Sequence, residues 1–148
     1  MLIDTSILAR TLQIRHPQYA MVTRAIEMLL DKGHNLHIVS QNLVELWVVA
    51  TRPVEQNGLG LTPGAAAGEL ARIKSMFEFL PDSAAVYPIW EGLVIQHNVS
   101  GKPAHDERLV AAMLANGLQS ILTFDASGFA RYAGIQIINP ADVIESPS

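Results

Sequence analysis

Short apolar runs alternate along this chain with longer segments of helical periodicity. Residues 1–4 form such a run, and four more predict strands at 36–39, 84–87, 121–124 and 135–138. Strands that are apolar on both faces are typical of parallel sheets covered by helices. The pattern therefore predicts an α/β fold with a central, mostly parallel sheet and helices on both faces.

Apolar positions three and four residues apart predict helices between these strands. The expected helices cover about 17–31, 40–52, 63–80, 88–101 and 105–116. Ser40 is expected to cap the second helix and Pro63 to occupy the first position of the third. We expect a loop at 54–61 and a short irregular piece before the last strand, and the chain shows no internal repeat.

Composition narrows the class of protein. A chain of 148 residues is expected to form a single domain over 1–148, and its lack of cysteine excludes a disulfide framework or a thiolate zinc site. No apolar run is long enough for a membrane helix, and the first residues lack a basic signal-peptide region, so a cytoplasmic protein is expected. The hydrophobic content of 49% suggests apolar surface covered by a partner or a second copy. The net charge of −4 gives no general attraction to nucleic acid.

Four carboxylates stand alone where the surrounding side chains are apolar. Asp4 ends the first apolar run, and Glu45 interrupts the sequence Leu-Val-Glu-Leu-Trp-Val-Val-Ala. Asp125 follows the strand segment Ile-Leu-Thr-Phe, and Asp106 opens a helix whose apolar stripe continues from it. A buried carboxylate costs several kcal/mol unless it is paired with a cation or holds a metal ion. Few basic residues lie near these acids in the sequence.

Each acid also has a simpler structural explanation. Asp106 could cap its helix, and Asp4 or Asp125 could cap the turn after its strand. Glu45 could reach the rim of a buried helix or pair with a distant arginine. Glu107 and Arg108 face away from the apolar stripe and are expected to be solvated. Four such coincidences in one small domain are much less plausible than one shared site.

A shared site is expected because parallel strands carry ligands at their carboxyl ends, where Asp4 and Asp125 fall. Carboxylates without matching bases indicate a hard divalent cation, and two such ions can support an in-line displacement at phosphorus. The five histidines are scattered without metal-ligand spacing, and no glycine-rich phosphate loop follows the first strand.

Four short motifs, in this order and spacing, resemble PIN-domain nucleases, especially VapC-like ribonuclease toxins of bacterial toxin–antitoxin pairs. They are Met-Leu-Ile-Asp-Thr-Ser-Ile-Leu at 1–8, Gln-Asn-Leu-Val-Glu at 41–45, His-Asp-Glu-Arg-Leu-Val-Ala-Ala at 105–112 and Leu-Thr-Phe-Asp-Ala-Ser-Gly-Phe at 122–129. The resemblance implies a PIN-like three-layer fold. Related sequences often carry an acid at the position of Gly128, and some have Asn at that of Asp125.

The resemblance also implies an activity. Asp4, Glu45, Asp106 and Asp125 would be the catalytic acids of an endoribonuclease dependent on Mg²⁺ or Mn²⁺, with Asp4, Asp106 and Asp125 as the metal ligands. The ions would activate water to cut RNA and leave a 5′-phosphate and a 3′-hydroxyl. The supporting and substrate-binding residues would be Thr5 and Thr123 as hydroxyls beside the acids, and Arg108, Lys102 and Arg52 as phosphate contacts unless these cations are merely solvated.

The resemblance also implies partners, and two other functions compete with the one that it implies. The expected partners are an RNA substrate, a cognate antitoxin whose C-terminal segment blocks the site, and a second copy in a homodimer. A magnesium-dependent phosphatase on a related topology is the enzymatic alternative. A degenerate PIN module that only binds protein is the other, although such a module has no reason to keep four isolated acids.

Overall fold

The structure, a computed structural model, describes residues 1–145 and contains an entirely parallel five-stranded sheet in the order β3-β2-β1-β4-β5. The strands are β1 (Leu2–Ile3), β2 (His37–Val39), β3 (Glu78–Leu80), β4 (Ser120–Leu122) and β5 (Gln136–Ile138). The helices are α1 (Thr5–Thr11), α2 (Tyr19–Asp31), α3 (Ser40–Thr51), η1, a 3₁₀ helix (Val54–Gln56), α4 (Pro63–Met76), α5 (Val86–Gln96), α6 (Pro103–Ala115), α7 (Ala126–Phe129) and α8 (Pro140–Glu145). The predicted α/β class is confirmed.

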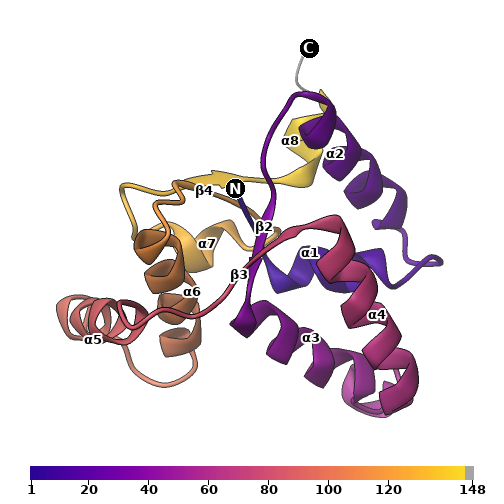
Figure 1. Ribbon diagram of the computed structural model, residues 1–148, viewed down its shortest axis with the longest axis horizontal. Helices are drawn as coiled ribbons and strands as arrows, with labels where there is room; N and C mark the ends of the chain where they lie inside the picture. The colour runs from indigo at the N-terminus through magenta and orange to yellow at the C-terminus, as the bar shows by residue number, and fades with distance from the viewer. Residues whose placement is uncertain (146–148) are drawn as a thin grey trace.

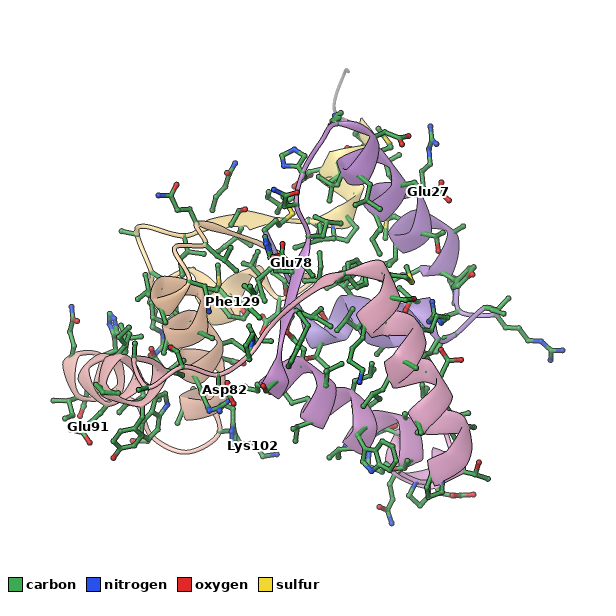
Figure 2. The ribbon with its side chains drawn as sticks, in the orientation of Figure 1. Glu27, Glu78, Asp82, Glu91, Lys102 and Phe129 are labelled. Atoms are coloured by element: carbon green, nitrogen blue, oxygen red, sulfur yellow. The ribbon has the colours of Figure 1, made fainter. Side chains whose placement is uncertain are left out.

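The sheet separates two hydrophobic cores, as its alternating side chains require. Successive strand residues point to opposite faces, so Leu2 and Ile3 of the central strand enter different cores. Ile3 packs with residues of α1–α4 and α8, whereas Leu2 packs with residues of α5, α6 and α7. Figure 1 shows these two groups of helices on either side of the strands, and Figure 2 shows Phe129 of α7 beside α6. The three-layer arrangement that the sequence predicts is confirmed.

The third strand lies earlier in the chain than predicted. The helix expected to reach residue 80 ends at Met76, and Glu78–Leu80 forms the edge strand β3, paired in parallel with β2. The residue before Pro81 is biased toward extended backbone, which favours the strand over a longer helix. The predicted strand at 84–87 is wrong, because Val86 begins α5.

Smaller differences concern helix ends. Ser40 is the first residue of α3 rather than its cap, and the backbone N–H of Val39 is bound by the side chain of Asn42 at 2.8 Å. α5 ends at Gln96, before Asn98 in the left-handed conformation, and not near residue 101. None of the helices within residues 1–145 has the length and hydropathy that a membrane crossing requires.

Candidate active site

Two of the four predicted acids lie at the carboxyl ends of neighbouring strands. Asp4 follows β1 and caps α1, with its Oδ1 accepting a hydrogen bond of 2.8 Å from Thr5 N. Asp125 follows β4 and caps α7 through Gly128 N at 3.1 Å. Thr123 connects them, because its hydroxyl donates to Asp4 Oδ2 at 2.6 Å and accepts from Asp125 N at 2.9 Å. The pairing of β1 with β4 thus brings both acids to one edge of the sheet.

Glu45 reaches the same edge from α3. Its Oε2 accepts a hydrogen bond of 2.9 Å from the Thr5 hydroxyl, one residue after Asp4. Its Oε1 accepts one of 2.6 Å from Gln41 Nε2, which also donates to the backbone oxygen of His105 at 2.8 Å. Asn42 Nδ2 donates to the Thr5 hydroxyl at 3.2 Å. The Glu45 carboxylate is therefore fixed by groups from α1 and α3 and linked to the start of α6.

Asp106 approaches from the first turn of α6 and is half-buried. Burial raises the pKa of Asp106, and the negative charges of Asp4, Asp125 and Glu45 raise it further, while His105 has a smaller opposing effect. A carboxylate feels such repulsion only when other acids lie nearby. We call Asp4, Glu45, Asp106 and Asp125 the acid cluster.

The acid cluster has no ion-pair partner within the part of the chain that the structure describes. Within residues 1–145, none of the four ion pairs includes one of its members. Burial raises the pKa of Asp4, and the charge of Glu45 adds to this, although hydrogen bonds from Thr123, Ser6 and Thr5 oppose the shift. In that part of the chain, no three histidine or acidic side chains are already arranged to hold an ion. The cluster is a group of repelling carboxylates rather than a closed cage.

Comparison of the sequence with protein families gives one match that covers most of the chain. Residues 1–135 match the profile of the PIN-domain family. The chain belongs to the PIN-domain family. A comparison with curated proteins finds no match.

Solved structures share the PIN-domain fold at low sequence identity. VapBC2 of Rickettsia felis, solved with a DNA fragment from its promoter, is 17% identical with a TM-score of 0.68, covering 93% of this chain and 96% of that chain. VapC20 of Mycobacterium tuberculosis, a toxin that cleaves the sarcin–ricin loop, is 20% identical with a TM-score of 0.64, covering 88% and 94%. FitAcB of Neisseria gonorrhoeae is 20% identical with a TM-score of 0.65, covering 95% and 97%.

The glycine at position 128 of this PIN domain has a geometric reason. A Cβ atom added at Gly128 would lie 2.5 Å from Asp125 Oδ2 and 3.0 Å from its Cγ. The Asp125 carboxylate is folded back over the short helix α7, where it accepts from Gly128 N and from the Ser127 hydroxyl at 3.0 Å. The glycine therefore makes room for the conformation that Asp125 adopts.

The three predicted phosphate contacts of the PIN domain differ in their surroundings. Arg108 lies beside the acid cluster, where its Nη1 donates to Gln41 Oε1 at 3.0 Å. Lys102 is exposed at the start of α6, as Figure 2 shows. Arg52 follows α3 and donates to the backbone oxygen of Asn57 at 3.1 Å, so it holds the loop after α3. Their contact with a substrate stays a prediction.

Three polar residues that the sequence argument gave no role complete the site. Ser6 donates to Asp4 Oδ2 at 3.0 Å, and Gln41 and Asn42 make the contacts with Glu45 and Thr5 described above. The signal for Gln41 and Asn42 was present, since they are the only polar residues one turn before Glu45.

The prediction that Glu107 is solvated is wrong, because its side chain is 0% exposed. Its Oε1 lies 3.6 Å from Arg131 Nη1, and neither carboxylate oxygen has a hydrogen-bond partner in residues 1–145. Glu107 faces the core of α5, α6 and α7, where its neighbours one turn on, Val110 and Ala111, are also buried. Arg108, also expected to be solvated, is only half exposed.

Proposed function

We propose that this PIN-domain protein is a metal-dependent endoribonuclease that acts as the toxin of a toxin–antitoxin pair. The observation that carries the proposal is the acid cluster, in which four carboxylates meet at the ends of β1 and β4 without a cation. Such a cluster is unfavourable by itself, and a bound divalent cation relieves the repulsion.

The donor set fits Mg²⁺ or Mn²⁺, since these ions prefer carboxylate oxygens. Asp4, Asp106 and Asp125 would hold the ion, and Glu45 would complete the site. Mg²⁺ commonly keeps several waters and uses only one or two carboxylates, so it does not need three acids in contact beforehand. When bound, such an ion polarises a phosphodiester and lowers the pKa of a coordinated water.

The chain's own residues hold the carboxylates in place. Thr123 and Ser6 both donate to Asp4 Oδ2, while Thr5 N donates to Oδ1, so this carboxylate is fixed from two sides. Gln41 and Thr5 each bind one oxygen of Glu45. Fixed carboxylates lower the reorganisation required when a substrate phosphate arrives. The hydroxyls of Thr5, Ser6 and Thr123 all donate to carboxylates of the cluster, so we assign them a positioning role and expect water to act as the nucleophile.

The proposed protein partner is an antitoxin, in keeping with the toxin–antitoxin complexes that share the fold. An apolar surface hollow lined by α3 and α4 supports such a partner; its residues are Leu43, Val44, Trp47, Val48 and Leu70. Val44 is 64% exposed and also lines the cavity that contains Glu45. A segment covering this hollow would therefore end beside the acid cluster. We also propose that the protein is a homodimer in the cytoplasm. The molecular mass in solution of the purified protein, separated from any antitoxin, tests whether it is a dimer.

Cleavage of RNA tests the proposed activity. With Mg²⁺ or Mn²⁺, the purified protein should cut internal phosphodiesters in a panel of transfer and ribosomal RNA fragments, and a chelator should stop the reaction. The Asp106→Asn variant should be slower by about 100-fold or more, because losing one ligand removes several kcal/mol of charge stabilisation. A negatively charged protein binds RNA weakly overall, so a few RNAs should be cut selectively.

The outcomes separate the alternatives. Equal cleavage by the wild type and Asp106→Asn, prepared identically, would reveal a contaminating ribonuclease and count against the proposal. Hydrolysis of small phosphate esters without RNA cleavage would indicate the phosphatase. Tight binding of a co-expressed partner without any hydrolysis would indicate a degenerate module.

A further inference from the structure

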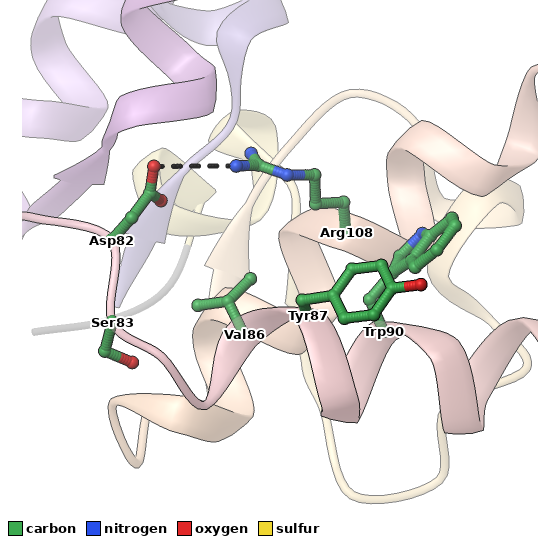
Figure 3. A pocket seen from close by; sticks show the side chains of 6 residues that line it. All are labelled: Asp82, Ser83, Val86, Tyr87, Trp90 and Arg108. Carbon is green, nitrogen blue, oxygen red and sulfur yellow. Dashed lines mark ion pairs between the residues drawn. The ribbon is translucent and has the colours of Figure 1, made fainter.

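A second cavity lies beside the acid cluster and contains the two aromatic rings of α5, Tyr87 and Trp90. It has a volume of about 400 Å³ and is lined by Asp82, Ser83, Val86, Tyr87, Trp90 and Arg108. Figure 3 shows the Arg108–Asp82 pair at one end of this cavity and the rings of Tyr87 and Trp90 at the other, with Val86 between them. We call it the aromatic hollow. None of its residues belongs to the acid cluster.

Both rings of the aromatic hollow are held in place, although Tyr87 is exposed and Trp90 is half-buried. Tyr87 is 62% exposed, and its hydroxyl donates to Glu91 Oε2 at 2.8 Å. The Trp90 indole N–H donates to the backbone oxygen of Ala104 at 2.8 Å, which fastens α5 to the start of α6. The two ring centroids are 5.7 Å apart, with the planes inclined by 36°. An exposed ring held in one orientation offers a face for stacking at little cost in side-chain entropy.

The aromatic hollow continues into the acid cluster. Asp82 and Arg108 also line the neighbouring cavity, of about 370 Å³, which contains Gln41 and Glu45. Arg108 Nη1 binds Gln41 Oε1 at 3.0 Å, and Gln41 Nε2 binds Glu45 at 2.6 Å. Gln41 therefore connects the Arg108 guanidinium to the Glu45 carboxylate through two hydrogen bonds.

The arginine is available to a phosphate. Its contact with Asp82 is a single ion pair of 3.5 Å, and the two side chains are 39% and 46% exposed. Such a long, solvated pair contributes little, so a phosphate oxygen can replace the carboxylate at the guanidinium. Proteins recognise single-stranded nucleic acid with three elements: a ring for stacking, a cation for the phosphate and hydrogen-bonding groups for the edge of a base.

We propose that the aromatic hollow binds the nucleobase of the nucleotide next to the cleaved phosphate. The base stacks on Tyr87, Arg108 contacts its phosphate, and Asp82 and Ser83 face its polar edge. The inference rests on the proposed ribonuclease function and adds a subsite for the unpaired substrate strand. A nucleotide fits better than a protein segment because the hollow joins the acid cluster through Arg108. Its lining also combines two rings with one cation, one carboxylate and the hydroxyl of a serine.

The test compares Tyr87→Ala with an RNA that lacks one base. The probes are a single-stranded RNA fragment that the wild type cuts, and two copies of it with an abasic ribose on either the 5′ or the 3′ side of the cut. Binding is measured in the Asp106→Asn background by fluorescence anisotropy, and cleavage kinetics in the wild-type background. The matched controls are Tyr87→Phe, which keeps the ring, and Ile95→Ala, which changes another exposed side chain of α5.

Tyr87→Ala should weaken binding of the intact RNA by roughly 5- to 150-fold, the range expected for loss of one stacked base. Tyr87→Phe and Ile95→Ala should bind like the parent. On one of the two abasic RNAs, Tyr87→Ala should bind as tightly as the parent. That RNA lacks the base that stacks on Tyr87, so removing the ring costs no further binding. An equal loss on both abasic RNAs would mean a structural defect and overturn the proposal.

Other outcomes also overturn it. If Tyr87→Ala cuts and binds RNA normally, the aromatic hollow is not a base subsite, while the ribonuclease function stands. If that variant instead loses a co-expressed partner or a second copy, the hollow belongs to a protein interface. If the wild type neither binds nor cuts any RNA, the proposed function fails and the subsite with it.

Discussion

Asp106 and Glu107 are neighbours on α6, yet their carboxylates lie in opposite electrostatic surroundings. Asp106 is half-buried and faces three other acids, whose charges raise its pKa together with burial. Glu107 is fully buried on the core side of the same helix, 3.6 Å from the guanidinium of Arg131. Asp106 therefore lies among other carboxylates and forms no ion pair within residues 1–145, whereas Glu107 is paired with an arginine in the core.

This difference shows which property supports the proposed functional role of Asp106. Burial alone would select Glu107 over Asp106, because Glu107 is the less exposed of the two. The absence of a cationic partner, combined with repulsion from other acids, selects Asp106. Unrelieved repulsion is unfavourable for folding and is expected where a ligand supplies the missing charge.

The largest expected effect that separates the two acids is the response to metal. Mg²⁺ at about 100 times its Kd should raise the free energy of unfolding of the wild type by about 2.7 kcal/mol. For a chain of this size, that corresponds to a Tm higher by roughly 5–10 °C. Asp106→Asn should lose most of the increase, because the acid that shares the ion's charge is gone. Differential scanning calorimetry with Mg²⁺ and with a chelator measures it.

A matched control is Asp31→Asn, which neutralises an exposed acid at the end of α2. It should keep the full metal response. An unchanged response in Asp106→Asn would place the ion elsewhere and break the contrast between Asp106 and Glu107.

A somewhat smaller effect is expected on the other side of α6. Arg131→Ala should lower the free energy of unfolding by about 2 kcal/mol, since it leaves the buried Glu107 without a cation. The loss is below that of a fully buried pair because the Arg131 side chain is 41% exposed. Chemical denaturation measures the change, and the metal response should be retained.

Arg108→Ala is the matched comparison for this second experiment, because it breaks an ion pair whose carboxylate is not buried. Its effect on stability should stay below about 1 kcal/mol. If the two arginine variants lose equal free energy of unfolding, the burial of Glu107 does not determine how much its ion pair stabilises the protein.

The smallest expected effect concerns pH. The pKa values of Asp4 and Asp106 are raised in the folded protein, so between the ordinary carboxyl pKa and the raised ones the folded state binds more protons than the unfolded state. The stability contribution of these acids therefore falls as pH rises through that window. Urea denaturation of the metal-free protein from acidic to neutral pH should show a shallower fall for Asp106→Asn. An identical pH profile would show that Asp106 is not repelled by its neighbours.

Much of the fold was predictable because its central elements have strong local signals. β1 and β4 are apolar on both faces, and the helix at α6 has clear limits at Pro103 and Gly117. β3 was misplaced because it is an edge strand with Glu78 exposed and Phe79 39% exposed, so it lacks the continuous apolar run of a buried strand. Its strand conformation depends on pairing with β2, which no local pattern reveals.

The proximity of the four acids was predictable for a similar reason, whereas their catalytic role stays a prediction. Strand ends and isolated charges locate the four acids in the sequence, and the structure brings them together through the pairing of β1 with β4 and through Thr5 and Gln41. The burial of Glu107 was not predicted because only one face of this helix, the apolar stripe that continues from Asp106, was expected to be buried. That helix is covered on more than one side, by α5, by α7 and by the sheet.

The glycine at position 128 has a consequence for the evolution of the site. Because a side chain there would begin 2.5 Å from Asp125 Oδ2, any residue other than glycine at position 128 requires the Asp125 carboxylate to leave its present position over α7. The two positions should covary across the family, with glycine at 128 accompanying an aspartate at 125. A residue other than aspartate at 125 should accompany an acid at 128. Divergent PIN domains would then exchange the residue that carries the charge while conserving the charge of the site.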